Sequence, residues 1–415
     1  MSPRVFSVSV GVLLALLQVV PSTIALDNGL ALTPPLGWSS WLALGERDYC
    51  DEKTLRDSTD ALIETGLAAA GYNTVMISDC WGAAGRSTAG KLLANTTRFP
   101  SGSLAGVIDY IHSKGLRAGV YQDIGTYTCV GRRSGMYGHY TSDAQQLALE
   151  WKIDWIKIDN CNDPKKPTDL YPQVAKAFND TKRPVLINLC EWGVEDPWKW
   201  APECGNSWRV TGDHMDEFKS TRGIILKQIG MSNYSGAAKH GWNDMDMVFT
   251  GLADQQPPGK RYFPGQTHTE YVTEFSMWAL LQSPLVWTGD VRNMSDFQRA
   301  VLLNFDVLAV HNDTSAPQGD LIGKLDKAGD VQVWRKLIND RRNQAVVVVN
   351  LGETAFPAAR VTFEMLGLSA TTQAIVTDLW SKVNVTAIGA YPQAASGRSL
   401  DPHACFMVKV FPLPI

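Results

Sequence analysis

Short apolar runs recur eight times between residues 36 and 290, and longer amphipathic stretches separate them. Runs rich in β-branched and aromatic residues that alternate with amphipathic stretches are typical of parallel strands joined by crossover helices. The eight expected strands are residues 36–38, 72–79, 117–123, 154–160, 184–190, 207–213, 242–247 and 284–290. A (β/α)8 barrel has this number of repeats and typically takes about 250 residues. The sequence therefore predicts an α/β fold, a (β/α)8 TIM barrel over residues 26–316.

The pattern changes after about Pro317, where helical spacing gives way to five short alternating runs. Alternation of apolar and polar residues is typical of antiparallel strands that bury one face. We therefore expect a C-terminal antiparallel β-sandwich domain over residues 317–415, packed against the barrel. Its expected strands are residues 331–337, 345–350, 360–363, 374–379 and 405–411. In the barrel, the helix candidates are residues 52–70, 104–114, 142–151, 171–179, 217–229 and 267–281.

Residues 1–25 have the composition of a secretory signal peptide, with Arg4, an apolar stretch and a small-residue site before position 26. The apolar stretch is shorter than the ~20 residues that span a bilayer, which argues against an uncleaved anchor. We expect a secreted, extracellular glycoprotein that has no membrane attachment after cleavage. Delivery to a vacuole or lysosome is an alternative destination. A homodimer is a further possibility that the sequence leaves open. Six Asn-x-Ser/Thr triplets fit this route, at Asn95, Asn179, Asn233, Asn293, Asn312 and Asn384.

Charge and residue spacing exclude several classes of function. The net charge of −4 and the scattered basic residues argue against a nucleic-acid partner. The seven histidines and seven cysteines lack the spacings of metal sites, so we expect neither a metal nor a cofactor. Residues 85–91 resemble a phosphate loop, but Leu92 replaces the required Ser or Thr, and the segment reads as a turn. The cysteines are disulfide candidates whose pairing the sequence alone does not determine.

Carboxylates stand at or next to the carboxyl ends of most expected strands. Active sites of barrels lie at this end, and buried carboxylates cost several kcal/mol unless they are paired or hydrogen bonded. The ring therefore predicts a site for a ligand with several hydroxyl groups, and its members are Asp79, Asp123, Asp159, Glu191, Asp213, Asp244, Asp246 and Asp290. Aromatic residues at the same ends are candidates for stacking on a sugar, although each alone is more often a core residue: Trp38, Trp41, Trp81, Tyr121, Trp192 and Trp242.

Two of these carboxylates share an expected strand with a cation. Lys157 and Asp159 are two residues apart and so face the same side, where the lysine favours the ionised carboxylate that a nucleophile needs. Arg209 and Asp213 are four apart and share a face in the same way, which suits Asp213 to protonate a leaving oxygen. The alternatives are structural ion pairs. Paired carboxylates are what glycoside cleavage requires.

Seven motifs follow one another in the order found in glycoside hydrolase family 27 of clan D, the α-galactosidases or melibiases, which this chain resembles. They are Leu26-Asp27-Asn28-Gly29-Leu30, the run from Pro35 to Trp41, Asp79-Cys80-Trp81, Lys157-Ile158-Asp159-Asn160-Cys161, Cys190-Glu191-Trp192-Gly193, Trp208-Arg209 with Asp213, and the run from Gly241 to Met247. The resemblance implies a retaining exo-glycosidase that hydrolyses terminal α-D-galactosyl residues of a carbohydrate substrate by double displacement.

The resemblance also implies roles for individual residues. It makes Asp159 the nucleophile and Asp213 the acid/base, and it lets Glu191 and Trp192 accept a plain 2-hydroxyl, which favours galactose over N-acetylgalactosamine. It implies the disulfides Cys50–Cys80 and Cys129–Cys161, with Cys190–Cys204 as a further candidate and Cys405 single. The positions expected to line the sugar pocket are Trp41, Ser78, Asp79, Tyr121, Lys157, Cys161, Glu191, Trp192, Arg209 and Met247.

One position departs from the family pattern, because Ser78 stands where the first of two consecutive aspartates is usual. In the family that aspartate holds the sugar 6-hydroxyl, so a charge-assisted contact worth about 1.5–3 kcal/mol would weaken. A second hypothesis is therefore a β-L-arabinopyranosidase, whose sugar lacks that hydroxyl, and Ser78→Asp should shift preference towards galactose. Alternatively, a water or Gln122 restores the contact. A third hypothesis is a sugar-binding barrel without catalysis.

Overall fold

The structure is a computed structural model that describes residues 26, 28–44, 48–131, 133–256, 262–357, 359–392 and 399–414. The signal peptide expected at residues 1–25 lies outside these ranges. None of the helices within them has the length and apolarity needed to cross a membrane.

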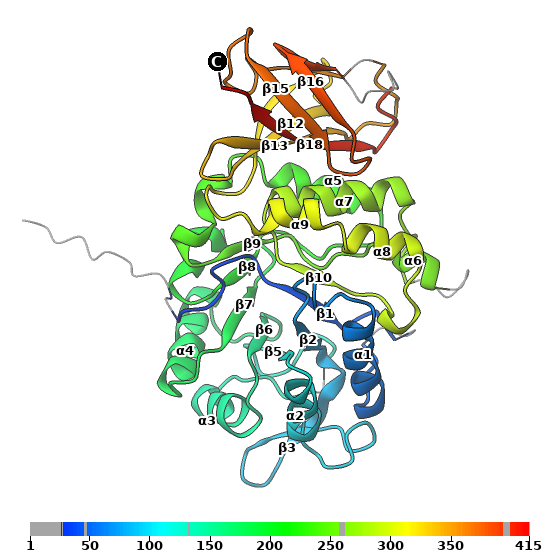
Figure 1. Ribbon diagram of the computed structural model, residues 1–415. Helices are drawn as coiled ribbons and strands as arrows, with labels where there is room; N and C mark the ends of the chain where they lie inside the picture. Colours follow the sequence, from blue (N-terminus) through cyan, green and yellow to red (C-terminus); the bar gives the residue numbers. More distant parts are fainter. Residues whose placement is uncertain are drawn as a thin grey trace, which may run out of the picture.

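Eight parallel strands form one sheet, in the order β10-β1-β2-β5-β6-β7-β8-β9, which confirms the predicted barrel strands (Figure 1). Just beyond β9, the Val248 N–H donates to the Val286 carbonyl of β10 at 2.9 Å and closes the curled sheet. The strands are β1 (Leu36–Ser39), β2 (Thr74–Ile77), β5 (Arg117–Asp123), β6 (Trp155–Asp159), β7 (Leu186–Cys190), β8 (Ser207–Arg209), β9 (Trp242–Asp244) and β10 (Leu285–Trp287).

Helices follow the barrel strands as the amphipathic pattern predicts. Helix α1 begins at a capping box made by Asp51 and Thr54, and it ends before Gly66 (φ 85°), so it is shorter than the expected residues 52–70. The helices are α1 (Glu52–Glu64), α2 (Ala105–Ser113), α3 (Tyr140–Gln145) with its π-helical continuation η2 (Gln146–Glu150), α4 (Pro167–Asp180), α5 (Phe218–Lys227), α6 (Leu252–Gln255), α7 (His268–Leu280), α8 (Asp296–Leu302) and α9 (Phe305–Asn312).

Several short elements were not among the predictions. Helices α6, α8 and α9 are of this kind, and so is the hairpin of β3 (Gly82–Arg86) and β4 (Leu92–Ala94). The connection of this hairpin, residues 87–91, lies within the expected turn at residues 85–91. Single-turn helices complete the loops, and they are η1 (Asp79–Trp81), η3 (Pro197–Lys199), η4 (Ala201–Glu203), η5 (Ser232–Tyr234), η6 (Ala237–Lys239) and η7 (Val291–Asn293).

The C-terminal part is an antiparallel sandwich, as predicted. Its six-stranded sheet has the order β11-β12-β13-β18-β15-β16, and a two-stranded sheet of β14 and β17 completes it. Strands β11, β16 and β17 were not expected. The bounds are β11 (Asp320–Lys324), β12 (Val331–Ile338), β13 (Asn343–Asn350), β14 (Arg360–Thr362), β15 (Gln373–Asp378), β16 (Asn384–Ile388), β17 (Ala390–Pro392) and β18 (Cys405–Pro412).

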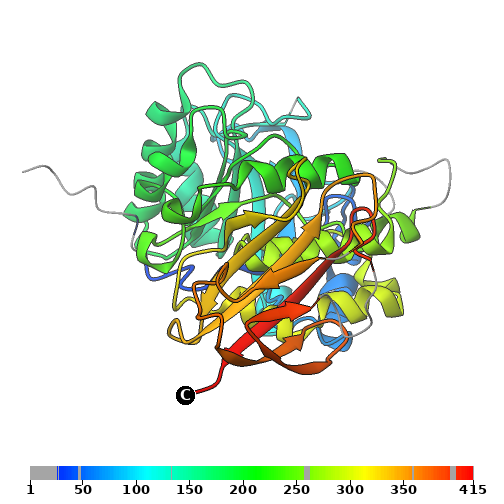
Figure 2. The ribbon, with the colours of Figure 1, turned by 90° about the horizontal axis from the view of Figure 1, so that it is seen from above.

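Strand β13 joins the two parts of the molecule, because its two faces belong to different cores. Val347 and Val349 lie in the hydrophobic cluster of the barrel, whereas Val346 and Val348 lie in the cluster inside the sandwich. Helix α7 packs against β13 and β18, and Figure 2 shows the orange and red strands lying over the barrel helices. A strand that is buried on both faces explains the continuous valine run of this segment.

We predict that Val347→Ala lowers the free energy of unfolding by about 1–3 kcal/mol, since it removes two buried methyl groups and leaves a cavity between the domains. Urea unfolding of both proteins measures the difference. Ile388→Ala is the matched control, because Ile388 is 66% exposed on β16. The control should stay within about 0.5 kcal/mol of the parent, and equal losses for both variants would contradict the prediction.

Candidate active site

Every residue predicted for the site lies in the last three residues of a barrel strand or shortly after it. Lys157 and Asp159 are on β6, Tyr121 is on β5 and Arg209 ends β8. The remaining predicted residues follow the ends of β1, β2, β6, β7, β8 and β9, and they are Trp41, Ser78, Asp79, Cys161, Glu191, Trp192, Asp213 and Met247. Parallel strands bring these positions to one end of the barrel.

The Lys157 and Asp159 side chains meet, as their spacing on one strand predicts. Lys157 Nζ lies 3.5 Å from Asp159 Oδ1, and both residues are largely buried. Burial lowers the pKa of Lys157, but Asp159 and other nearby anions outweigh it and raise the pKa above its usual range, so the ammonium stays charged. Tyr121 pairs with Lys157 in the register of β5 and β6, and burial together with Asp159 raises the pKa of its hydroxyl.

Asp123 supports the loop beside Asp159, and the structure does not offer it as a free ligand. Its carboxylate accepts the Gly125 N–H at 2.7 Å and the Cys161 N–H at 2.9 Å, and the residue is fully buried. Burial raises the pKa of Asp123 to about 9, although both N–H groups oppose this. The disulfide between Cys129 and Cys161 lies against this loop, with Cys129 Sγ 3.5 Å from Asp159 Oδ2.

Arg209 and Asp213 also meet, but strand β8 is shorter than the expected residues 207–213. Strand β8 ends at Arg209, and the following loop turns back because the Arg209 guanidinium donates to the Gly212 carbonyl at 2.8 Å. Arg209 Nη2 then lies 3.4 Å from Asp213 Oδ1. The Asp213 side chain is 73% exposed, and the Trp192 indole N–H donates to it at 2.9 Å.

The stronger partner of Arg209 is Asp246, a residue that the sequence placed at the strand ends without a role. Its Oδ2 lies 2.9 Å from Arg209 Nη2 and accepts the His214 N–H at 2.9 Å. Asp246 has a left-handed backbone (φ 77°), and its Oδ1 accepts the Met247 N–H. Burial raises the pKa of Asp246, but Arg209 and Lys157 outweigh burial and lower it, so the pair is ionised.

A second network, around Arg133, was missed by the sequence reasoning. Arg133 Nη1 lies 2.5 Å from Asp48 Oδ2 and 3.2 Å from Asp79 Oδ2, and all three residues are largely buried. Burial outweighs Arg133 and raises the pKa of Asp79 to about 6. The Ser78 hydroxyl donates to Asp48 Oδ1 at 3.1 Å. The sequence contained a signal for the contact between Asp48 and Ser78. Asp48 precedes Cys50 by two residues, and Ser78 precedes its disulfide partner Cys80 by two.

Glu191 follows β7 and keeps one carboxylate oxygen free. Its Oε2 accepts the Glu195 N–H at 2.7 Å, while Oε1 is buried without a hydrogen bond from the described residues. Burial raises the pKa of Glu191 to about 7. The Gln122 amide accepts from the Asp123 N–H and donates to the Ser134 carbonyl, so one of its lone pairs and one of its N–H groups are in use.

Three of the six aromatic candidates belong to the core and do not line the mouth. The buried indoles of Trp38 and Trp81 donate to backbone carbonyls of Gly289 and Tyr121. Trp242 begins β9, and its indole donates to a carbonyl at the opposite end of the barrel. Trp41, Tyr121 and Trp192 remain at the mouth.

Asp290 was predicted as a member of the carboxylate ring, but its side chain has other partners. Its side chain caps η7 by accepting the Arg292 N–H, and it forms a close ion pair with the Arg292 guanidinium at 2.7 Å. Its carboxylate is therefore used by its own loop.

The disulfides Cys50–Cys80 and Cys129–Cys161 are present, which confirms both pairings. The further pairing of Cys190 with Cys204 is wrong, because both are free and buried, and Cys190 Sγ instead faces Arg209 Nη1 at 3.7 Å. Cys405 is free, as expected.

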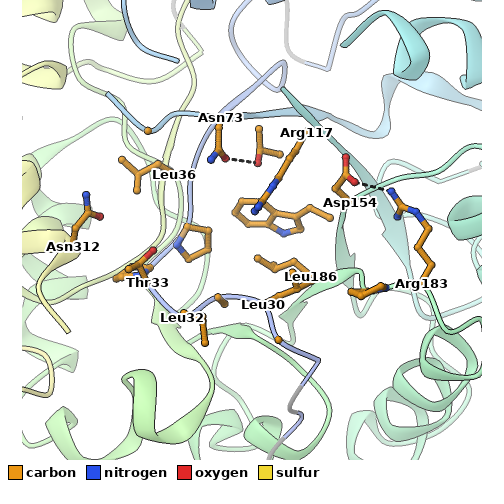
Figure 3. A pocket seen from close by; sticks show the side chains of 18 residues that line it. Leu30, Leu32, Thr33, Leu36, Asn73, Arg117, Asp154, Arg183, Leu186 and Asn312 are labelled. Carbon is orange, nitrogen blue, oxygen red and sulfur yellow. Dashed lines mark hydrogen bonds and ion pairs between the residues drawn. The ribbon is translucent and has the colours of Figure 1, made fainter. Parts of the chain in front are cut away.

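A cavity of about 640 Å³ lies at the opposite end of the barrel, where the strands begin (Figure 3). Arg117 and Leu186, the first residues of β5 and β7, line it. Its carboxylate, Asp154, is engaged by Arg183 at 2.7 Å and by His112 at 2.7 Å. This acid therefore has structural partners, and active sites of barrels lie at the other end.

A closed parallel barrel with two cation-paired carboxylates at its mouth is the arrangement of barrel glycoside hydrolases. The chain belongs to the α-galactosidase family, glycoside hydrolase family 27. The family model described as alpha galactosidase A matches residues 33–313, and that of the alpha galactosidase C-terminal beta sandwich domain matches residues 328–410.

Individual relatives agree with this assignment. Alpha-galactosidase 2 of Arabidopsis thaliana is 37% identical over 391 residues, which cover 93% of this chain and 91% of that protein. The crystal structure of α-galactosidase I from Mortierella vinacea has a TM-score of 0.82 and 30% identity, and the match covers 92% of this chain and 98% of that one. A GH27 β-L-arabinopyranosidase from Geobacillus stearothermophilus shares the fold, with a TM-score of 0.79, 22% identity, and coverage of 93% and 98%.

We predict that His214 makes the protein less stable as the pH falls. Burial lowers the pKa of His214 from 6.5 to about 4. Between these pH values the unfolded chain binds a proton on His214 that the folded chain does not, so the free energy of unfolding decreases as pH falls through this window.

The test compares the parent with His214→Gln in urea between pH 7 and pH 4. The variant lacks this proton linkage, so the stability difference between the two proteins should shrink by about 3 kcal/mol over that range. A difference that stays constant with pH would contradict the assignment of a neutral, buried His214.

Proposed function

We propose that this protein is a secreted, retaining exo-α-galactosidase that releases terminal α-D-galactosyl residues by double displacement. The observation that carries the proposal is the pair of aspartates at one barrel mouth, with Asp159 beside Lys157 and Asp213 beside Arg209. Their surroundings differ, because the first is buried and the second is exposed. Unequal surroundings suit two carboxylates for the two roles of a retaining enzyme.

Asp159 is the proposed nucleophile. Its buried Oδ1 is free of hydrogen bonds from the described residues, and Lys157 lies 3.5 Å away. The ammonium favours the carboxylate over the neutral acid. In the first step the carboxylate attacks C1 of the sugar, a C–O bond to the enzyme forms, and the bond to the leaving oxygen breaks.

Asp213 is the proposed acid/base. In the first step its carboxyl group gives a proton to the leaving oxygen, and in the second step its carboxylate takes a proton from the water that attacks C1. The Trp192 indole and the Arg209 guanidinium orient the carboxylate, while the exposed side chain leaves room for an aglycone and then for water.

The proposed sugar pocket consists of Trp41, Ser78, Asp79, Tyr121, Lys157, Cys161, Glu191, Trp192, Arg209 and Met247. Buried polar atoms of folded proteins are nearly always hydrogen bonded. Asp159 Oδ1, Glu191 Oε1 and Arg209 Nε are buried without hydrogen bonds from the described residues. Hydroxyl groups of a bound sugar can satisfy these atoms, which supports a carbohydrate substrate.

β-L-Arabinopyranosidase activity is the second candidate function, because Ser78 replaces a carboxylate in the family pattern. Aryl α-D-galactoside, aryl β-L-arabinopyranoside and aryl α-N-acetylgalactosaminide separate the candidates by their kcat/KM values. The α-galactosidase proposal requires the first to be the best substrate.

We predict that Asp213→Ala lowers turnover of an aryl α-galactoside by roughly 10²- to 10⁴-fold, the usual contribution of a general acid–base group. Asp159→Ala should lose more than about 10³-fold, because no covalent intermediate can form. Asp290→Asn is the control, since its carboxylate is occupied by Arg292. Near-parental turnover in the Asp159 variant would refute the assignment.

Added azide distinguishes the two roles. In the Asp213 variant azide replaces water in the second step and should yield α-galactosyl azide, because two inversions retain the configuration. In the Asp159 variant azide replaces the nucleophile, and its single displacement should yield β-galactosyl azide. NMR spectroscopy of the products identifies the anomer, and the opposite pattern would exchange the roles.

A further inference from the structure

Asp48 lies beside Ser78, the position that departs from the family pattern. The Ser78 hydroxyl donates to Asp48 Oδ1 at 3.1 Å, and the Ser40 hydroxyl in turn donates to the Ser78 hydroxyl at 3.1 Å. Ser40 is fully buried, and both Ser78 and Asp48 are buried as well. A carboxylate from a different loop therefore stands next to the serine that replaced one.

The chain brings these two residues together by a covalent link. Cys50 follows Asp48 by two residues, Cys80 follows Ser78 by two, and the two cysteines form a disulfide with Cα atoms 5.6 Å apart. The Asp48 N–H also donates to the Trp41 carbonyl at 2.7 Å. The loop that carries Asp48 is thus tied both to the end of β2 and to the segment after β1.

Charge explains why Asp48 and a serine occur together. The carboxyl carbon of an aspartate at position 78 would stand close to the present Ser78 Oγ, because both are the first atom beyond Cβ. Its oxygens would then lie beside Asp48 Oδ1, and two carboxylates that share a site repel each other. Arg133 already compensates Asp48 and Asp79. An aspartate at position 78 would be a third acid, for which Arg133 has no charge left.

Asp48 has acceptor capacity left for a ligand. A carboxylate offers about four acceptor positions, and Asp48 uses one on Ser78 and one on Arg133. The neighbouring Gln122 is a weaker acceptor, because its amide is uncharged and its oxygen already accepts the Asp123 N–H.

We propose that Asp48 is a specificity residue, whose carboxylate accepts the 6-hydroxyl of the sugar in place of the aspartate that residue 78 lacks. The inference rests on the proposed galactosidase function and deepens it. Galactose is then preferred over L-arabinopyranose in spite of Ser78, because the carboxylate that binds the 6-hydroxyl is on Asp48, in another loop. Arg133 positions Asp48 and does not contact the sugar.

The experiment measures kcat/KM on 4-nitrophenyl α-D-galactopyranoside and 4-nitrophenyl β-L-arabinopyranoside, which differ in the hydroxymethyl group. Asp48→Asn should lower the galactoside value by about 10- to 100-fold, the loss expected for a hydrogen bond to a charged group. The arabinopyranoside value should remain near that of the parent. Asparagine tolerates the left-handed backbone of Asp48 (φ 56°), so the loop is retained.

The exchange variant Asp48→Asn with Ser78→Asp provides a second measurement. It returns one carboxylate to position 78 and removes its competitor, so it should recover the galactoside preference that Asp48→Asn loses. Ser78→Asp alone should not raise the galactose preference above that of the parent, contrary to the expectation from the sequence, because it places two acids side by side. Asp143→Asn is the matched control, since Asp143 is a buried acid 2.6 Å from Arg86. That control should lose stability without a change in the substrate ratio.

Equal loss on both substrates in Asp48→Asn, or a ratio that the exchange variant does not recover, would overturn the inference and leave Asp48 a structural acid. If the parent hydrolyses the galactoside well and only the ratios fail to move, the proposed function stands and the inference falls. If the parent hydrolyses neither substrate, or favours the arabinopyranoside, both are wrong.

Discussion

Buried charge at the carboxyl ends of the barrel strands is the constraint on which the proposed site depends. The Arg209 guanidinium is 1% exposed, and a buried charge that loses its partner costs several kcal/mol. It needs Asp246 at 2.9 Å and the Gly212 carbonyl at 2.8 Å. These contacts turn the loop after β8 back over the mouth and place Asp213 within 3.4 Å of the same guanidinium. An exposed aspartate is therefore held in place by a buried ion pair.

On the other side of the mouth, a largely buried arginine again holds acidic residues in place. Arg133 is held between Asp48 and Asp79, and the Cys50–Cys80 disulfide joins the two segments that carry these acids. Here the arginine sits on a loop after β5 and the acids come from the loops after β1 and β2. Charge compensation therefore connects three neighbouring loops at this side of the mouth.

The sequence predicted what depends on local spacing and failed where tertiary contacts decide. The eight barrel strands were found because buried parallel strands are continuous apolar runs. Residues 207–213 were taken as one strand because Val210 and Thr211 favour strands, yet the contact of Arg209 with Gly212 ends the strand early. Strands β11 and β16 were missed because their half-exposed residues give a weak pattern. Lys157 and Asp159 were paired correctly since two residues on one strand share a face.

Contacts between residues on different loops could not be predicted from local spacing. Asp246 lies far along the chain from Arg209, and Asp48 contacts Ser78 across two loops that a disulfide joins. Cys50–Cys80 was implied by the family resemblance, so the proximity of Asp48 to Ser78 was accessible in principle. What the sequence did not contain was the direction of the Asp48 side chain, which Arg133 determines.

The two ends of the barrel differ in how the carboxylates of Asp154, Asp159 and Glu191 are used. At the end where strands begin, Asp154 is shared by His112 and Arg183 and also accepts the Ala118 N–H. At the mouth, buried oxygens of Asp159 and Glu191 have no hydrogen bond from the described residues. Proteins rarely leave such atoms unsatisfied, so the difference marks where a ligand with hydroxyl groups completes the structure. The same argument supports the role proposed for Asp48, because a carboxylate with unused acceptor positions can accept a hydrogen bond from one more hydroxyl group.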